Sequence, residues 1–132
     1  MPSFYIVGKP QPKQRPRFSR GHAYTPTETR NYERIVRCAY KEQCHNTRLN
    51  GAIKADIIVS VKIPKSTPKK QLPLYENGTI RPTKKPDADN IIKSVLDALN
   101  ETAYEDDSQV IDVHCVKQYG YEDGVYVELL EI

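Results

Sequence analysis

The chain has 132 residues, 38% of them hydrophobic, and a formal net charge of +3. This length suits a single domain over residues 1–132, because two halves would each be too small for a sizeable core. It has no run of about eighteen apolar residues, no signal-peptide pattern and only three scattered cysteines, so we expect no membrane partner, no disulfide framework and a cytoplasmic location.

The first segment predicts a short strand followed by a basic loop. Phe4 and Ile6 alternate with polar neighbours over residues 3–7, as in a half-buried strand. Residues 8–21 hold three prolines, which are disfavoured in sheet ladders and helix interiors, so we expect an extended loop there. Proline stiffens this loop and lowers the entropy cost of presenting its cations. The loop carries Lys9, Lys13, Arg15, Arg17 and Arg20, with Phe18 among them.

A helix and the clearest strand of the chain follow. Residues 25–28 read Thr-Pro-Thr-Glu, a capping box that predicts a helix start, and the helix should fade near Asn46. Its apolar stripe consists of Tyr32, Ile35, Val36, Ala39 and Tyr40. Residues 52–63 alternate between apolar and polar side chains, which predicts a strand with one buried and one wet face.

The second half predicts a long loop, a helix and two strands. Residues 64–86 contain five prolines and six basic residues, so we expect a functional loop. A helix with an apolar stripe should run from after Pro86 to near Asn100, and strands should cover residues 109–119 and 125–130. The element order therefore predicts an α+β (mixed α/β) fold.

Basic and acidic residues are segregated along the chain. Residues 1–86 hold 18 Lys or Arg against 5 Asp or Glu, a net +13, whereas residues 87–132 hold 2 against 12, a net −10. Such asymmetry fits two interpretations. In the first, the basic and acidic faces pack against each other within the domain or across a dimer. In the second, a basic surface binds a polyanion beside an acidic site that binds a divalent metal.

The acidic residues have a pattern that suits metal chemistry. Asp87 and Asp89 are two apart at a helix start, and a strand returning beside that helix can bring Asp107 toward them. Converging carboxylates repel one another unless a cation joins them, and Mg²⁺ prefers such oxygen ligands. Lys93, one turn after Asp89, could stabilise charge in phosphodiester cleavage. The alternative is that Asp87 and Asp89 cap the helix and that Asp89, Lys93 and Asp97 form an exposed ion-pair ladder.

The same residues carry a family resemblance. A set of motifs stands in the second half of the chain: residues 85–90 (Lys-Pro-Asp-Ala-Asp-Asn), Lys93, residues 97–100 (Asp-Ala-Leu-Asn), Tyr104 and residues 106–110 (Asp-Asp-Ser-Gln-Val). This set closely resembles the signature of the RusA family of Holliday-junction resolvases. The N-terminal region of the chain also resembles that of the family, at residues 8–10, Lys13, residues 15–17 and residues 24–26. The resemblance implies a fold of two β-α-β units around a mixed sheet.

It also implies an activity, a cofactor and a partner. The implied protein is a homodimeric, Mg²⁺-dependent endonuclease that resolves four-way DNA junctions by paired cleavage in recombination and repair, with Mn²⁺ as a substitute. The implied metal ligands are Asp87, Asp89 and Asp107, with Asp106 a weaker candidate, and Lys93 is the implied catalytic lysine. Glu101 follows Asn100 where many members carry Gly, so we expect Asn100 to take the left-handed conformation that ends the helix.

Basic side chains of the two loops should contact DNA phosphates. The candidates are Lys13, Arg15, Arg17, Arg20, Lys84 and Lys85. Phe18 and Tyr24 either stack on an opened base or pack against the first helix. The shared interface of a dimer should involve the strand at 52–63 or the closing strand.

Other readings carry less weight. Two remain open: a non-catalytic DNA-binding protein whose acidic cluster is a partner or dimer surface, and an Mg²⁺-dependent hydrolase of small nucleotides. The spacing of the cysteines and histidines fits no common zinc site, so Cys38 and Cys115 are expected in the core.

Overall fold

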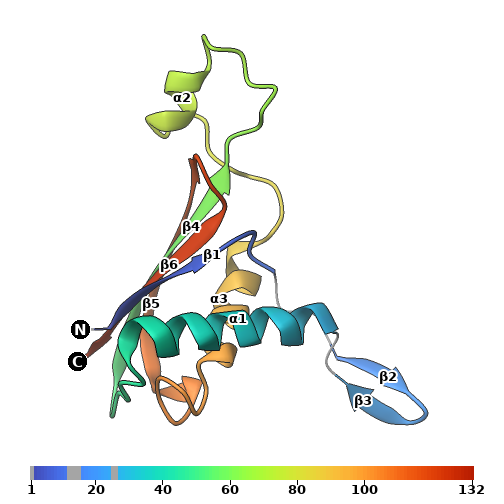
Figure 1. Cartoon of the computed structure of the whole chain (residues 1–132), viewed down its shortest axis with the longest axis vertical. Coiled ribbons are helices and arrows are strands. Elements are labelled where there is room, and N and C mark those ends of the chain that lie inside the picture. The colour runs from blue at the N-terminus through green and yellow to red at the C-terminus, as the bar shows by residue number, and fades with distance from the viewer. Residues whose placement is uncertain (1, 12–15, 25–26) are drawn as a thin grey trace.

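A four-stranded mixed sheet forms the centre of the protein, with strand order β1-β6-β4-β5. The computed structural model (Figure 1) describes residues 2–11, 16–24 and 27–132. β4 pairs in parallel with β5 and antiparallel with β6, which pairs antiparallel with β1. In chain order the elements are β1 (Ser3–Val7), β2 (Arg17–Ser19), β3 (His22–Tyr24), α1 (Thr27–Cys44), β4 (Ile53–Lys62), α2 (Leu72–Glu76), α3 (Ala88–Ala98), the 3₁₀ helix η1 (Asp107–Gln109), β5 (Val110–Gly120) and β6 (Gly124–Glu131).

This topology confirms the predicted mixed fold. α1 connects β1 to β4, and α3 connects β4 to β5. β1 and β4 are each antiparallel to β6, so they run parallel to each other, as β4 and β5 do. The chain therefore contains two β-α-β units that share β4, with β6 inserted between the strands of the first unit.

α1 and α3 cover the same face of the sheet. The alternating residues of β4 predicted to be buried, Ile53, Ala55, Ile57 and Val59, are at most 1% exposed. They join one core cluster with apolar side chains of β1, β6, α1 and α3. Burial of such side chains contributes roughly 1.5–3 kcal/mol each, so this face holds the sheet and helices together. No helix among the described residues is long and apolar enough to cross a membrane.

The two predicted helices form, and the apolar stripe of the first is narrower than expected. In α1, Tyr32, Val36 and Tyr40 are buried, but Ile35 is 49% exposed. α1 ends at Cys44, close to the predicted end, and the first two residues of the predicted capping box, 25 and 26, lie outside the described residues. The helix predicted after Pro86 is α3, with Ile91, Val95 and Leu96 buried.

Two segments expected to be loops contain regular structure. Residues 17–24 form the β2–β3 hairpin, because the prolines of the predicted loop end at Pro16 and Arg20-Gly21 takes a two-residue turn with φ of 53° and 79°. The loop at 64–86 contains α2, whose first turn includes Pro73, a position where proline is tolerated. Figure 1 shows the hairpin and α2 at opposite ends of the molecule.

One expectation about the cysteines is wrong, and the other is met in part. Cys38 is exposed, because it lies on α1 between the buried turns of Val36 and Tyr40, and Cys44 is the buried cysteine. Cys115 is partly buried and packs against the core. Ile111 is 67% exposed because β5 is an edge strand, and its register with β4 shifts beside Ile53.

Candidate active site

The candidate site follows one face of α3. Asp89, Lys93 and Asp97 are spaced four residues apart and therefore lie on the same side of the helix. Asp89 and Lys93 are exposed, and Asp97 is half-buried. Asp87 holds the N-cap position but makes no capping hydrogen bond with its side chain. Helix capping therefore does not account for the exposed carboxylate of Asp87.

The loop that leads into α3 brings basic residues to the same end. Lys84 and Lys85 are exposed, and the ammonium group of Lys117 on β5 donates a hydrogen bond of 2.7 Å to the carbonyl of Lys84. The peptide between Lys85 and Pro86 is cis. A pocket of about 300 Å³ lies here, and Lys9, Lys62, Lys84 and Lys85 line it together with Pro86. Tertiary structure thus places Lys9, from the first loop, beside the predicted lysines of the second.

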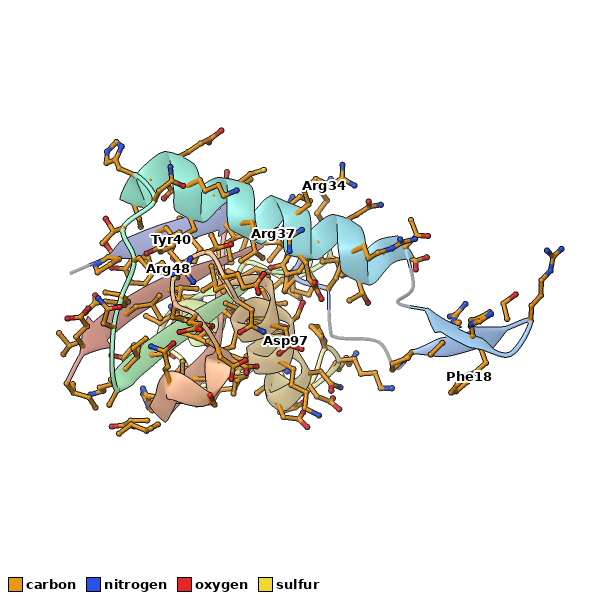
Figure 2. All side chains as sticks on the ribbon, turned by 90° about the horizontal axis from the view of Figure 1, so that it is seen from below. Phe18, Arg34, Arg37, Tyr40, Arg48 and Asp97 are labelled. Atoms are coloured by element: carbon orange, nitrogen blue, oxygen red, sulfur yellow. The ribbon has the colours of Figure 1, made fainter. Side chains whose placement is uncertain are left out.

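The other end of α3 brings two carboxyl groups into contact. The side chain of Asp97 shares a hydrogen bond with that of Asp107, at the start of η1. This hydrogen bond, with partial burial and the charges of Asp97 and Asp106, raises the pKa of Asp107 to about 6. A carboxyl pair of this kind holds a shared proton or a cation. Figure 2 shows Asp97 on α3, the helix that packs against α1.

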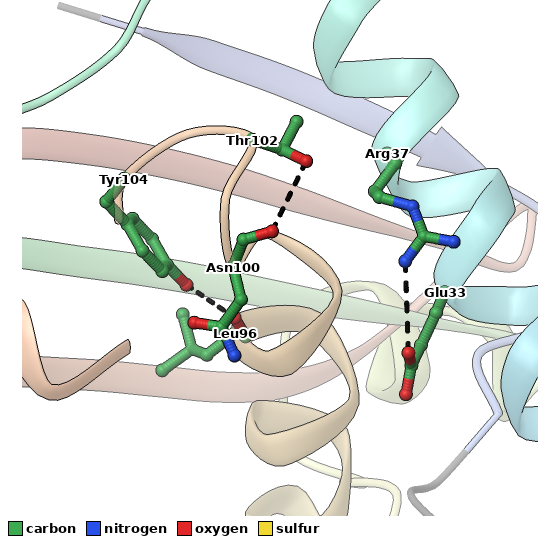
Figure 3. A network of polar contacts seen from close by, with 6 residues as sticks. All are labelled: Glu33, Arg37, Leu96, Asn100, Thr102 and Tyr104. Carbon is green, nitrogen blue, oxygen red and sulfur yellow. Dashed lines mark hydrogen bonds and ion pairs between the residues drawn. The ribbon is translucent and has the colours of Figure 1, made fainter. Parts of the chain in front are cut away.

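The backbone of Asp107 is held from the end of α3. Its N–H donates to the Asn100 side-chain oxygen at 2.7 Å. The buried Tyr104 hydroxyl donates to the Leu96 carbonyl at 2.6 Å, and Thr102 donates to the Asn100 carbonyl at 3.4 Å (Figure 3). These bonds tie the loop at residues 99–107 to the last turn of α3, so Asn100 and Tyr104 position Asp107.

Asp106 has a different local role. Its carboxylate accepts the N–H of Ser108, and the Gln109 side chain returns to the N–H of Asp106, which completes a capping box for η1. The hydrogen bonds from Ser108 lower the pKa of Asp106. Asp106 and Asp107 were expected at the start of a strand. They instead begin the 3₁₀ turn that precedes β5. The side chain of Asp106 caps this turn, and the side chain of Asp107 contacts Asp97.

The predicted set of acidic residues is therefore divided between two places. Asp87 and Asp89 lie at the start of α3, and Asp107 lies beside Asp97 near its end. Within residues 2–11, 16–24 and 27–132, no group of three or more His, Cys, Asp or Glu side chains is arranged to hold a metal ion. The Asp97–Asp107 pair nevertheless suits Mg²⁺, which binds through one or two carboxylates and keeps several waters for substrate phosphates to replace.

Several basic side chains that sequence reasoning did not propose as site residues lie on α1 and in the segment after it. α1 packs against α3, and Arg30, Arg34, Arg37 and Lys41 recur along one side of α1 at helical spacing. Arg37 pairs with Glu33 at 3.9 Å beside the loop after α3 (Figure 3), and Arg48 donates to the Glu101 carbonyl at 3.3 Å. The helical period of these cations was the signal that could have found them.

The remaining predicted cations lie in the N-terminal half. Arg17 and Arg20 are exposed on the β2–β3 hairpin, and Lys13 and Arg15 lie outside the described residues. Phe18 does not pack against α1 and is 78% exposed.

Glu101, rather than Asn100, takes the left-handed conformation after α3, with φ of 60°. A side chain at this φ is strained by its Cβ, which glycine lacks. We expect Glu101→Gly to stabilise the protein by about 1 kcal/mol and to raise Tm by about 4 °C in a thermal melt. Glu105→Gly, in the same loop but not at positive φ, should lower Tm. Equal shifts in both variants would contradict the strain argument.

Two comparisons with known proteins match nearly the whole chain. A family model described as Endodeoxyribonuclease RusA matches residues 7–130 of the chain. The chain is also 36% identical over 135 residues to "Uncharacterized protein YqaN" from Bacillus subtilis (strain 168), and the match covers 98% of this chain and 95% of that protein. The family match spans the basic loops, α3 and the Asp97–Asp107 pair.

Proposed function

Because the chain belongs to the RusA family of endodeoxyribonucleases, we propose that it is an Mg²⁺-dependent enzyme that resolves four-way DNA junctions by paired phosphodiester cleavage in recombination and repair. The observation that carries this proposal is the Asp97–Asp107 carboxyl pair. The pair lies at the C-terminal end of α3, the helix that packs against α1 and follows the lysine-bearing loop. An acidic pair within basic surroundings suits a metal ion and a polyanion together.

The proposed ligands of Mg²⁺ include Asp107, joined by Asp97, with Asp87 and Asp89 as the further ligands that the family signature implies. Bound Mg²⁺ would lower the pKa of a water and polarise a phosphoryl oxygen. Lys93 is exposed on the same helix face and is proposed to stabilise charge on the phosphodiester. Asn100 holds the backbone of Asp107 in place for this arrangement.

The decisive experiment uses a labelled four-way junction. The full-length protein should cut it in two symmetry-related strands in the presence of Mg²⁺ or Mn²⁺, and cleavage should stop in EDTA. A linear duplex of the same sequence should remain uncut. Junction binding without cleavage at any metal concentration would instead support a non-catalytic DNA-binding protein.

Lys84 and Lys85 are proposed to contact phosphates. Replacing both with Ala should flatten the dependence of log affinity on log salt by about two units, since each lost phosphate contact removes about one. The matched control is Lys65→Ala with Lys69→Ala, two exposed lysines of the same long loop. Titrations of a junction at several salt concentrations measure the slopes. Parallel slopes for wild type and the Lys84/Lys85 variant would place this loop off the DNA.

The enzyme is proposed to act as a homodimer, because paired cuts in two strands need two equivalent sites. β4 and β6 lie inside the sheet, so they cannot pair edge-to-edge with another copy. They can present side chains from the sheet face opposite α1 and α3, where Ile58 is 37% and Leu130 38% exposed.

We expect light scattering to give twice 15.1 kDa for the wild type. Ile58→Glu should reduce this mass to that of a monomer, because a charge in an apolar interface is costly. Ile35→Glu, at an exposed isoleucine of α1, should leave the dimer intact. A monomeric wild type that makes both cuts in one binding event would contradict the dimer.

A further inference from the structure

The β2–β3 hairpin is a small, well-defined element. Arg17, Phe18 and Ser19 pair with Tyr24, Ala23 and His22, respectively. Arg20 and Gly21 form the connecting turn, both with positive φ, which matches the twist of a tight hairpin. The hairpin therefore presents its side chains in a fixed alternation, with Phe18 and Ala23 on one face.

The apolar face of this hairpin has no cover in the described part of the chain. All three residues of β2 are exposed, and Phe18, at 78%, is more exposed than any other large apolar residue described. Figures 1 and 2 show the hairpin beyond the N-terminal end of α1, away from the sheet. A two-stranded ribbon alone is marginally stable in water, so its exposed phenyl ring suits a partner that covers it.

The charge around Phe18 selects the kind of partner. Arg17 and Arg20 flank it within the hairpin, and no Asp or Glu occurs before Glu28. An apolar protein surface would gain nothing from these cations, whereas a nucleic acid offers phosphates for the arginines and a base for the ring.

We propose that the hairpin is a DNA-contacting arm and that Phe18 stacks on a nucleobase at the branch point of the junction. This inference rests on the proposed function. At a branch point the continuous stacking of a duplex is interrupted, so a base there is available to an aromatic ring at lower cost than within a duplex.

Binding to a junction that carries 2-aminopurine at the branch point tests the proposal. The wild type should change the fluorescence of this base, and Phe18→Ala should abolish the change and weaken junction binding roughly five- to a hundred-fold. Phe18→Trp should retain both effects. Binding to a linear duplex should be nearly the same in all three proteins, because there the bases stay stacked.

Tyr121→Ala is the matched control, since Tyr121 is an aromatic residue 65% exposed in the β5–β6 turn. This variant should bind the junction with the affinity of the wild type and should change the 2-aminopurine fluorescence to the same extent. An unchanged 2-aminopurine signal and affinity in Phe18→Ala would overturn the inference while the wild type still cleaves junctions. Loss of dimer mass in Phe18→Ala would also overturn it, because the ring would then cover a partner subunit. A wild type that neither binds nor cuts junctions would refute the proposed function itself.

Discussion

Asp107→Asn is expected to lower junction cleavage by roughly a thousand-fold or more, since the Lewis acidity of a bound metal is worth several kcal/mol in the transition state. Junction affinity should stay the same or rise, because the substitution removes negative charge near the phosphates. The backbone N–H that donates to Asn100 remains, so the loop should keep its conformation. Single-turnover cleavage and a binding titration in Ca²⁺ measure the two effects separately.

Asp106→Asn is the matched control for this experiment. It makes the same change of charge at the neighbouring residue, and Asn is as good an N-cap as Asp, so η1 should persist. Cleavage by this variant should stay within a few-fold of the wild type. Equal losses in the two variants would show that local charge, rather than a ligand at position 107, controls cleavage.

Asp89→Asn and Asp97→Asn then identify the carboxylates that act with Asp107. The family signature favours Asp89, whereas the observed contact favours Asp97. We expect both variants to lose cleavage and to retain binding. A variant that loses binding and cleavage in equal measure would not be a metal ligand.

The second large effect concerns stability. Tyr104 is fully buried, its hydroxyl donates to the Leu96 carbonyl, and burial raises its pKa. Tyr104→Ala should lower the free energy of unfolding by about 4 kcal/mol, because it leaves a cavity and an unpaired carbonyl in the core. Tyr104→Phe should cost only about 1 kcal/mol, the net value of one hydrogen bond.

Urea denaturation of the two variants separates the cavity from the hydrogen bond. Tyr121→Ala, at a tyrosine that is 65% exposed and whose hydroxyl donates to the Glu76 carboxylate, should lower the free energy of unfolding by no more than about 1 kcal/mol. If Tyr104→Phe were as unstable as Tyr104→Ala, the hydrogen bond rather than packing would hold the loop that positions Asp107.

Local patterns in the sequence determined the main elements. The alternation at residues 52–63 gives β4 its buried face, and Val95 and Leu96 of the predicted stripe give α3 its core side. These patterns are readable because side-chain periodicity is a local property of strands and helices. The carboxylates and basic loops were also readable from their residue types and spacing, and the family match agrees with that signature.

Contacts between distant segments were decided by the tertiary structure. No local signal pairs Asp107 with Asp97 rather than with Asp87 and Asp89, because the path of the loop after α3 depends on Tyr104 packing beneath it. The edge position of β5, which exposes Ile111, follows from strand order, and strand order depends on how the whole chain closes. The left-handed residue after α3 is Glu101 because the turn toward Asp107 needs positive φ at that position, whichever side chain occupies it.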